Sequence, residues 1–264
     1  MPNWQNDAEP MDLTRFQLTG KNALVTGARK GLGASIALAL AKAGANVACH
    51  GRSPADDGIV EQIRSGGTKS FYISGDLADV TICDRLVDAT LDEFGSIDIL
   101  INNAGIIRRT PAIDYSLEDW NEVIAVNLTA VFRLSQLAAK HMLDRGKGGK
   151  IVNVASLLSF QGGILVPAYA AAKAGVAQLT RSMANEWAAH GINVNAIAPG
   201  YMVTEVTTAL RQDANRSRQI LERIPAGRWG NPEDLAGAAV FLSSSASDYV
   251  HGHVLAVDGG WLGR

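Results

Sequence analysis

The chain has 264 residues, of which 47% are hydrophobic and 19% charged, and its formal net charge is −2. This balance excludes intrinsic disorder, which requires low hydrophobicity together with high net charge. It also excludes a generally basic nucleic-acid-binding protein, because the chain has no excess of cations to neutralise a run of phosphates.

Residues 1–17 are predicted to be an N-terminal extension. The segment 1–19 carries three carboxylates and no apolar stretch, so it lacks the pattern of a secretory signal. No run of about 18 uncharged apolar residues follows, and we expect a cytoplasmic protein without a membrane span. Two cysteines are too few for a disulfide scaffold, and Cys49 lies in an apolar run typical of a buried thiol. The five histidines lack metal-ligand spacing, so no metal site is predicted.

Strand-length apolar runs alternate with helix-length amphipathic runs along the rest of the chain. Strands are predicted at 22–26, 46–49, 69–73, 97–101, 150–155, 193–198 and 253–257. Helices are predicted at 32–43, 57–64, 80–94, 118–143, 168–189 and 233–242. This order predicts a single α/β domain, 1–264, with a Rossmann-type doubly wound parallel sheet of about seven strands and helices on both faces. A TIM barrel is the alternative, but it needs eight βα units.

The polar stretch 204–226 interrupts this alternation, because it contains no strand pattern. Long insertions in compact domains are often functional, and some close over a bound substrate. We therefore predict a substrate lid over 204–226.

A glycine-rich sequence, TGARKGLG at 26–33, joins the first predicted strand to the first helix. Gly27 suits a tight turn, while Gly31 and Gly33 let the main chain approach a pyrophosphate at the helix N-terminus. Arg29 and Lys30 add positive charge there. A glycine-rich turn without a ligand is the alternative, but the position between strand and helix favours a dinucleotide site.

The end of the second predicted strand bears on the choice of cofactor. A carboxylate about 20 residues after the glycine loop commonly binds the ribose 2′-hydroxyl. Here the chain has no carboxylate before Asp56, whereas Arg52 is available for a 2′-phosphate. This favours NADP over NAD; the alternative is that Arg52 is only a solvated loop residue.

Tyr169 and Lys173 are four residues apart in a predicted helix and therefore share one face. An ammonium beside a phenol stabilises the phenolate, so that the tyrosine can exchange a proton with a substrate hydroxyl. Ser156, at a strand end, could hold the substrate oxygen, and Asn127 is an unusual residue for mid-helix. Each residue also has an ordinary structural explanation. Tyr169 and Lys173 could form a surface pair, Ser156 could be a turn residue, and Asn127 could hydrogen-bond to the backbone. Together with a dinucleotide loop they indicate hydride transfer coupled to proton transfer.

The sequence from Leu18 onward resembles the short-chain dehydrogenase/reductase family. The resemblance rests on TGARKGLG (26–33), Asp76 in GDL, NNAG (102–105), Asn127, Ser156, YAAAK (169–173) and PG (199–200). It implies that Tyr169 is the acid and base, that Lys173 binds the ribose and lowers the tyrosine pKa, that Ser156 orients the substrate and that Asn127 holds a relay water. It also implies a homotetramer packed through its long helices. The cofactor-binding residues are then Gly27, Arg29, Lys30, Gly31, Leu32, Gly33, Arg52, Asp76, Leu77, Asn103, Ala104, Gly105, Tyr169, Lys173, Pro199, Gly200, Val203 and Thr204.

Further motifs, including NNAGIIRR (102–109), SLLSFQGG (156–163), NAIAPGYM (195–202) and VDGGW (257–261), are similar to the branch of the family that acts on sugar acids. This implies NAD(P)-dependent interconversion of a hydroxyl and a ketone on a deoxy keto-sugar acid. Arg108 or Arg109, at the carboxyl end of the fourth strand, could pair with the substrate carboxylate, with Arg108 preferred. Gln161 and Tyr201 could reach its hydroxyls.

Three other functions stay open. The chain could oxidise gluconate at carbon 5, or reduce another carbonyl class such as a 3-oxoacyl thioester. More remotely, it could be a dinucleotide sensor without catalysis, because the fold alone does not determine function.

Overall fold

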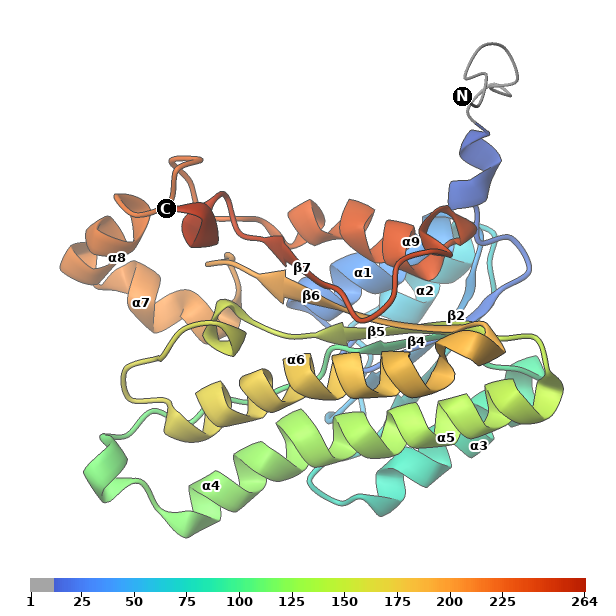
Figure 1. The fold of residues 1–264 in the computed structure, drawn as a ribbon, viewed down its shortest axis with the longest axis horizontal. Coiled ribbons are helices and arrows are strands. Elements are labelled where there is room, and N and C mark those ends of the chain that lie inside the picture. Colours follow the sequence, from blue (N-terminus) through green and yellow to red (C-terminus); the bar gives the residue numbers. More distant parts are fainter. Residues whose placement is uncertain (1–11) are drawn as a thin grey trace, which may run out of the picture.

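The computed structural model describes residues 12–264, and its centre is one sheet with the strand order β3-β2-β1-β4-β5-β6-β7 (Figure 1). All neighbouring strands are parallel. The sheet ends at β3 and β7 instead of closing, which confirms the predicted doubly wound α/β fold over a TIM barrel. The strands are β1 Asn22–Val25, β2 Asn46–Gly51, β3 Ser70–Ser74, β4 Ile99–Asn102, β5 Gly149–Val154, β6 Ile192–Pro199 and β7 Val254–Val257.

Helices cover both faces of this sheet (Figure 1). One face carries α1 Gly31–Lys42, α2 Ile59–Ser65 and α9 Ala236–Ser243. The other carries α3 Thr81–Phe94, α4 Leu117–Ile124, α5 Ala130–Arg145 and α6 Pro167–Trp187. Two short helices, α7 Thr208–Gln212 and α8 Ala214–Leu221, lie beyond the carboxyl end of β6, in the segment predicted as an insertion.

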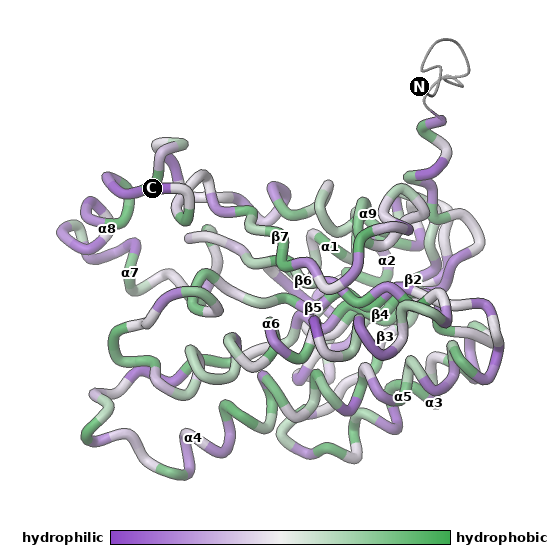
Figure 2. Tube along the Cα trace, in the orientation of Figure 1, coloured by the Kyte–Doolittle hydropathy of each residue, from purple (hydrophilic) through white to green (hydrophobic). Residues whose placement is uncertain are grey.

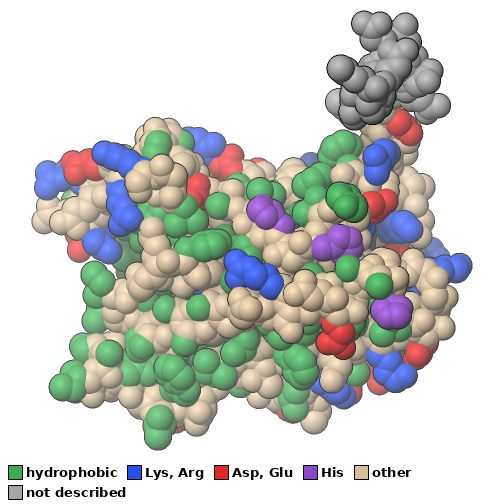
Figure 3. All heavy atoms as spheres, in the orientation of Figure 1, with side chains coloured by type: hydrophobic (Ala, Val, Ile, Leu, Met, Phe, Trp, Pro, Cys, Tyr) green, Lys and Arg blue, Asp and Glu red, His purple; other side chains and the backbone are tan. Residues whose placement is uncertain are grey.

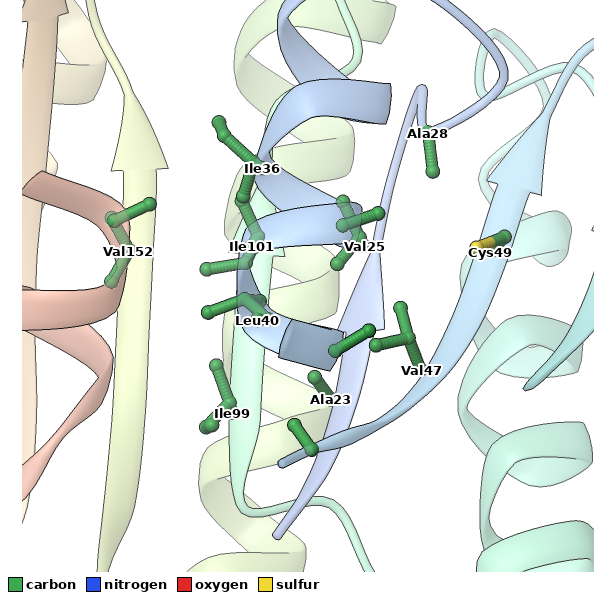
Figure 4. Close-up of a cluster of buried hydrophobic side chains, with 14 of the residues drawn as sticks. Ala23, Val25, Ala28, Ile36, Leu40, Val47, Cys49, Ile99, Ile101 and Val152 are labelled. Carbon is green, nitrogen blue, oxygen red and sulfur yellow. The ribbon is translucent and has the colours of Figure 1, made fainter. Parts of the chain in front are cut away.

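The central strands are buried because helices cover both faces of the sheet (Figure 1). All residues of β1 and β4 are buried. Ile36 and Leu40 of α1 lie against Ile99 and Ile101 of β4 (Figure 4), and burying each such side chain contributes about 1.5–3 kcal/mol. Cys49 is buried as predicted, and burial raises the pKa of its thiol to about 12. Figure 2 shows hydrophobic residues along the central strands and hydrophilic residues along α8.

The long helix predicted at 118–143 is interrupted by a wider π-helical turn, Ala125–Thr129. The helical run Leu117–Arg145, which includes α4, this turn and α5, is long and apolar enough to cross a membrane by length and composition alone. Half of its most apolar stretch is buried inside the protein, as in a helix that covers a sheet. π-turns occur frequently at functional positions, and this one contains Asn127.

Residues 12–17 are the described part of the predicted N-terminal extension. They contain a 3-10 turn, Leu13–Phe16, that lies beside the end of α9. Arg15 Nη2 donates to the carbonyl of Ser245 at 2.7 Å, and the Ser245 hydroxyl donates to the carbonyl of Arg15 at 3.1 Å. The rest of the extension, 1–11, is outside the described residues.

Candidate active site

A cleft of about 630 Å³ opens at the carboxyl ends of the strands, around the point where the chain order reverses between β1 and β4. Open α/β sheets bind their ligands at this switch point. Every residue predicted to contact the dinucleotide lines the cleft, with the exception of Val203. Val203 instead donates its backbone N–H to the carbonyl of Gly230 at 2.7 Å.

The glycine-rich segment 26–33, which runs from the end of β1 into the first turn of α1, has no room for side chains at Gly27 and Gly33. Gly27 has a φ of +65°, and a Cβ at Gly33 would lie 2.1 Å from the carbonyl oxygen of Gly27. The bare main chain therefore faces the cleft where α1 begins, with free N–H groups and a partial positive charge. Arg29 and Lys30 line the same part of the cleft. This cradle fits the pyrophosphate of a dinucleotide.

Asn103, at the end of β4, braces this loop. Its amide donates to the carbonyls of Thr26 at 2.8 Å and Gly27 at 3.2 Å. The hydroxyl of Thr26 in turn accepts the backbone N–H groups of Asn103 and Ala104, both at 3.0 Å. Thr26 was not among the predicted site residues, although it is the first residue of the glycine-rich motif.

His50 is a second brace that the sequence did not reveal. Its Nδ1 accepts the N–H of Gly27 at 3.4 Å, and its Nε2 lies 3.0 Å from the carbonyl of Gly75. Burial lowers the pKa of His50, which favours the neutral ring that these two contacts require. Its position could have indicated this role, because it follows a predicted strand and lies two residues before Arg52.

The end of β2 has a glycine where a typical NAD site has a carboxylate, and a side chain there would have to displace Tyr72. A Cβ at Gly51 would lie 2.4 Å from the hydroxyl oxygen of Tyr72. That hydroxyl is fixed, because it donates to the carbonyl of Ser53 at 2.8 Å. Arg52 lines the cleft beside this position, and Arg29 forms a 2.6 Å ion pair with Asp57. Arg52 would be the residue that holds a 2′-phosphate here, since Arg29 is already paired with Asp57.

Tyr169 and Lys173 lie one turn apart on α6 and both line the cleft. Lys173 is 3% exposed, and its Nζ donates to the carbonyl of Val154 at 2.6 Å. The same Nζ lies 5.7 Å from the centre of the Tyr169 ring. Burial lowers the pKa of Lys173 to about 8, so the ammonium loses its charge at mildly alkaline pH.

The pKa of Tyr169 is set by opposing effects. Burial raises it, whereas hydrogen bonding with Ser156 and the positive charge of Arg109 lower it. Burial is the largest of the three. The predicted lowering of this pKa by Lys173 stays a prediction; the Lys173 Nζ itself donates to a backbone carbonyl.

Asn127 occupies the π-helical turn between α4 and α5. It is fully buried, and its amide exchanges two 2.8 Å hydrogen bonds with the backbone of Ile106, one donated by each residue. A Cβ at Gly105 would lie 3.3 Å from the Asn127 oxygen and 3.8 Å from Lys173 Nζ. The backbone bonds explain an asparagine inside a helix, and its role in holding a relay water stays a prediction.

The two adjacent arginines after β4 differ in their partners. Neither arginine is among the residues that line the cleft. Arg108 forms ion pairs with Glu122 at 2.8 Å and Asp119 at 3.5 Å. Arg109 donates to the carbonyl of Val206 at 3.1 Å, and no carboxylate in the described chain pairs with it. Of the two arginines, only Arg109 lowers the pKa of Tyr169.

The other predicted substrate residues lie beside the cleft without lining it. Gln161 accepts the indole N–H of Trp261 at 2.9 Å. Tyr201 packs against Trp261 and Trp229, with ring centres 4.7 and 5.6 Å away. Both side chains therefore join the loop after β5 and the loop after β6 to the C-terminal turn.

The predicted lid touches the cleft through its first residues, 204–207. Glu205 forms an ion pair with Lys30 of the glycine loop, a contact that the sequence did not indicate. Ile220 and Ile224, further along, pack with Leu157 and Trp261. The segment therefore bridges the cofactor side and the substrate side of the cleft, and its opening and closing stay a prediction.

Comparison with known proteins agrees with this site. The family model described as Enoyl-(Acyl carrier protein) reductase matches residues 27–262. The 2-dehydro-3-deoxy-D-gluconate 5-dehydrogenase of Escherichia coli (strain K12) is 54% identical and covers 96% of this chain and 100% of that protein.

Two solved structures are also similar. One, from Agrobacterium tumefaciens with bound NADP, is assigned as a 2-deoxy-D-gluconate 3-dehydrogenase; it is 57% identical, with a TM-score of 0.89 over 95% of this chain and 99% of that one. The other, from Beutenbergia cavernae with NADP at low occupancy, is assigned as an NAD(P)-dependent gluconate 5-dehydrogenase. It is 50% identical, with a TM-score of 0.91 over 95% and 100%.

The chain therefore belongs to the short-chain dehydrogenase/reductase family. It is an NAD(P)-dependent oxidoreductase that acts on CH–OH groups, and the predicted resemblance to the sugar-acid branch is confirmed.

Proposed function

We propose that this protein interconverts a hydroxyl group and a ketone at carbon 5 of 2-dehydro-3-deoxy-D-gluconate, and that it prefers NADP to NAD. The observation that carries the proposal is that Tyr169 and Ser156 share the cleft, while Arg109, a cation without a carboxylate partner in the described chain, lies near enough for its charge to lower the pKa of Tyr169. A sugar acid presents a carboxylate together with a reacting hydroxyl. The carboxylate would meet Arg109, and the hydroxyl would meet Tyr169. The similar Escherichia coli enzyme supports the choice of substrate.

The chain's own residues supply binding and proton transfer. Tyr169 would take the hydroxyl proton during oxidation and return it to the carbonyl oxygen during reduction. Ser156 would hold that oxygen against the phenol, and Lys173 would bind the cofactor ribose. A bound nicotinamide supplies the hydride acceptor for oxidation and the hydride donor for reduction.

Initial rates with a substrate panel test the proposal. The panel contains 2-dehydro-3-deoxy-D-gluconate, 2-deoxy-D-gluconate, gluconate and a 3-oxoacyl thioester, and turnover is followed by the absorbance of the reduced nicotinamide. We expect the highest kcat/KM with the first compound. A higher value with the thioester would reject a sugar-acid substrate, and cofactor binding without any turnover would indicate a dinucleotide sensor.

Removing the Arg109 guanidinium should weaken binding of acidic substrates. We expect Arg109→Ala to raise KM for 2-dehydro-3-deoxy-D-gluconate about tenfold to a hundredfold, because a hydrogen bond to a charged group contributes about 1.5–3 kcal/mol. Arg108→Ala is the matched control, since its guanidinium already pairs with Glu122 and Asp119. A larger KM effect in the Arg108 variant would reverse the assignment of the two arginines.

Cofactor preference should depend on Arg52. We expect Arg52→Ala to raise KM for NADPH about tenfold or more and to leave KM for NADH nearly unchanged, because only NADPH carries the 2′-phosphate. Lys69→Ala removes an exposed cation just before β3 and serves as the control. Equal changes for the two cofactors would show that Arg52 does not bind the 2′-phosphate.

We also propose that the protein is a cytoplasmic homotetramer. Exposed apolar side chains gather over α4–α6 (Figure 3). Leu117 of α4 and Phe132 of α5 are 77% and 44% exposed. Contact between copies through this face would bury them.

A further inference from the structure

The turn that carries Ser156 is joined to α6 through the hydroxyl of Ser159. This hydroxyl donates to the carbonyl of Lys173 at 2.6 Å and accepts the backbone N–H of Ser156 at 3.3 Å. A serine hydroxyl has one hydrogen to donate, so the donated bond to Lys173 leaves its lone pairs for Ser156. One side chain outside the catalytic set therefore contacts the main chain of two catalytic residues.

The Ser156 side chain is fixed within the same short turn. Ser156 precedes the 3-10 turn Leu157–Ser159, and its Oγ accepts the N–H of Leu158 at 3.2 Å. Ser159 ends the turn and donates its own backbone N–H to the carbonyl of Ser156 at 2.9 Å. The turn is thus closed on itself, and its contact with α6 decides where Ser156 lies relative to Tyr169.

The catalytic residue Lys173 forms a second link between α6 and the end of β5. It is the 2.6 Å bond from Lys173 Nζ to the carbonyl of Val154. That bond depends on an amine whose pKa is about 8, and the amine is also the group expected to bind the cofactor ribose. The Ser159 hydroxyl does not titrate in this range and takes no part in the reaction, so its link persists when Lys173 changes partner or charge.

We propose that Ser159 is a positioning residue that keeps the Ser156 hydroxyl in register with the Tyr169 phenol. Without the Ser159 hydroxyl, the Ser156 N–H loses its acceptor and the turn can shift relative to α6. Displacements near 1 Å reduce enzymatic rates about a hundredfold, and a partly restrained turn should lose less.

The test is Ser159→Ala. We expect kcat to fall about tenfold with KM for the cofactor unchanged, because the dinucleotide cradle is not touched. Hydrogen bonding with Ser156 lowers the Tyr169 pKa against the effect of burial. Weakening it should therefore raise that pKa and shift the pH dependence of oxidation to more alkaline values, which a general loss of stability would not do.

Two further variants complete the experiment. Ser159→Thr keeps the hydroxyl and is expected to restore kcat and the pH dependence. Ser116→Ala removes another serine that accepts a backbone N–H, that of Asp119 at 3.1 Å, at the start of α4. It should lower the melting temperature without changing the pH dependence.

A wild-type pH dependence and kcat in Ser159→Ala, or equal behaviour of the Ala and Thr variants, would overturn the proposal. If Ser159→Ala does not fold, Ser159→Cys replaces it, because a thiol is a weaker donor. Its pH dependence must then shift relative to Ser159→Thr, and an unshifted profile overturns the proposal.

The kinetic readout rests on the proposed substrate, so a second readout is independent of it. Titration of the phenolate ultraviolet absorbance, taken as the difference between variants with Tyr169 and with Tyr169→Phe, reports the Tyr169 pKa without substrate. Lack of wild-type turnover counts against the proposed function alone. An unchanged Tyr169 titration in Ser159→Ala counts against the positioning role.

Discussion

Replacing Tyr169 with phenylalanine is expected to lower kcat in both directions by about a hundredfold to ten-thousandfold, the range that a positioned acid or base contributes. The phenol is the acidic group that α6 brings into the cleft beside Ser156, and phenylalanine cannot donate or accept a proton. Cofactor binding should survive, because the glycine loop and Lys173 are unchanged. Steady-state rates together with fluorescence titration of NADPH measure both quantities.

The pH dependence of the oxidation rate is a second test of Tyr169→Phe. Oxidation needs the phenolate, and burial raises the pKa of Tyr169. Wild-type oxidation should therefore increase as the pH rises towards that pKa, and residual activity of the variant should not. Tyr115→Phe is the control, because in the described chain the Tyr115 hydroxyl hydrogen-bonds only to the carbonyl of Arg108, at 3.4 Å. Unchanged turnover in Tyr169→Phe would remove the tyrosine from the mechanism.

Gly33→Ala should abolish productive cofactor binding. The added Cβ would lie 2.1 Å from the carbonyl oxygen of Gly27 and 2.5 Å from the Asn103 amide nitrogen. Neither neighbour can move without a large cost in free energy. The Gly27 carbonyl is part of the backbone, and the Asn103 amide holds the loop through two hydrogen bonds. We expect KM for NADPH to rise about a hundredfold or more, since the loop must open to relieve the overlap.

Gly237→Ala is the matched control for this substitution. Gly237 lies in α9, and a Cβ there would meet nothing within 4 Å. Alanine is favoured over glycine inside a helix by up to about 1 kcal/mol, so this variant should bind cofactor normally and melt at the same or a higher temperature. A normal KM in Gly33→Ala would mean that the loop does not contact the pyrophosphate.

The fold and the catalytic pair were predictable because their signals are local. Strand and helix runs alternate along the chain, the glycine motif stands between the first strand and helix, and Tyr169 and Lys173 are one helical turn apart. Each of these depends on spacing within a short segment, which hydrophobic periodicity and backbone geometry determine.

The rest of the site depends on contacts between distant segments. The π-turn forms where the Asn127 amide bonds to Ile106, 21 residues away, and helix propensity carries no information on that contact. The Lys30–Glu205 ion pair joins residues 175 positions apart. Arg108 and Arg109 have the same side chain, so the sequence does not distinguish their roles. Their roles differ because Glu122 and Asp119 of α4 pair with Arg108.

The packing of Tyr72 under Gly51 has a consequence for how this lineage can change its cofactor. An aspartate introduced at position 51 alone would collide with the Tyr72 hydroxyl, which would have to give up its bond to the carbonyl of Ser53. An aspartate at position 51 would therefore need Tyr72 to move away or to be replaced by a smaller side chain. Positions 51 and 72 should consequently vary as a pair among descendants of this sequence, even though they lie on different strands.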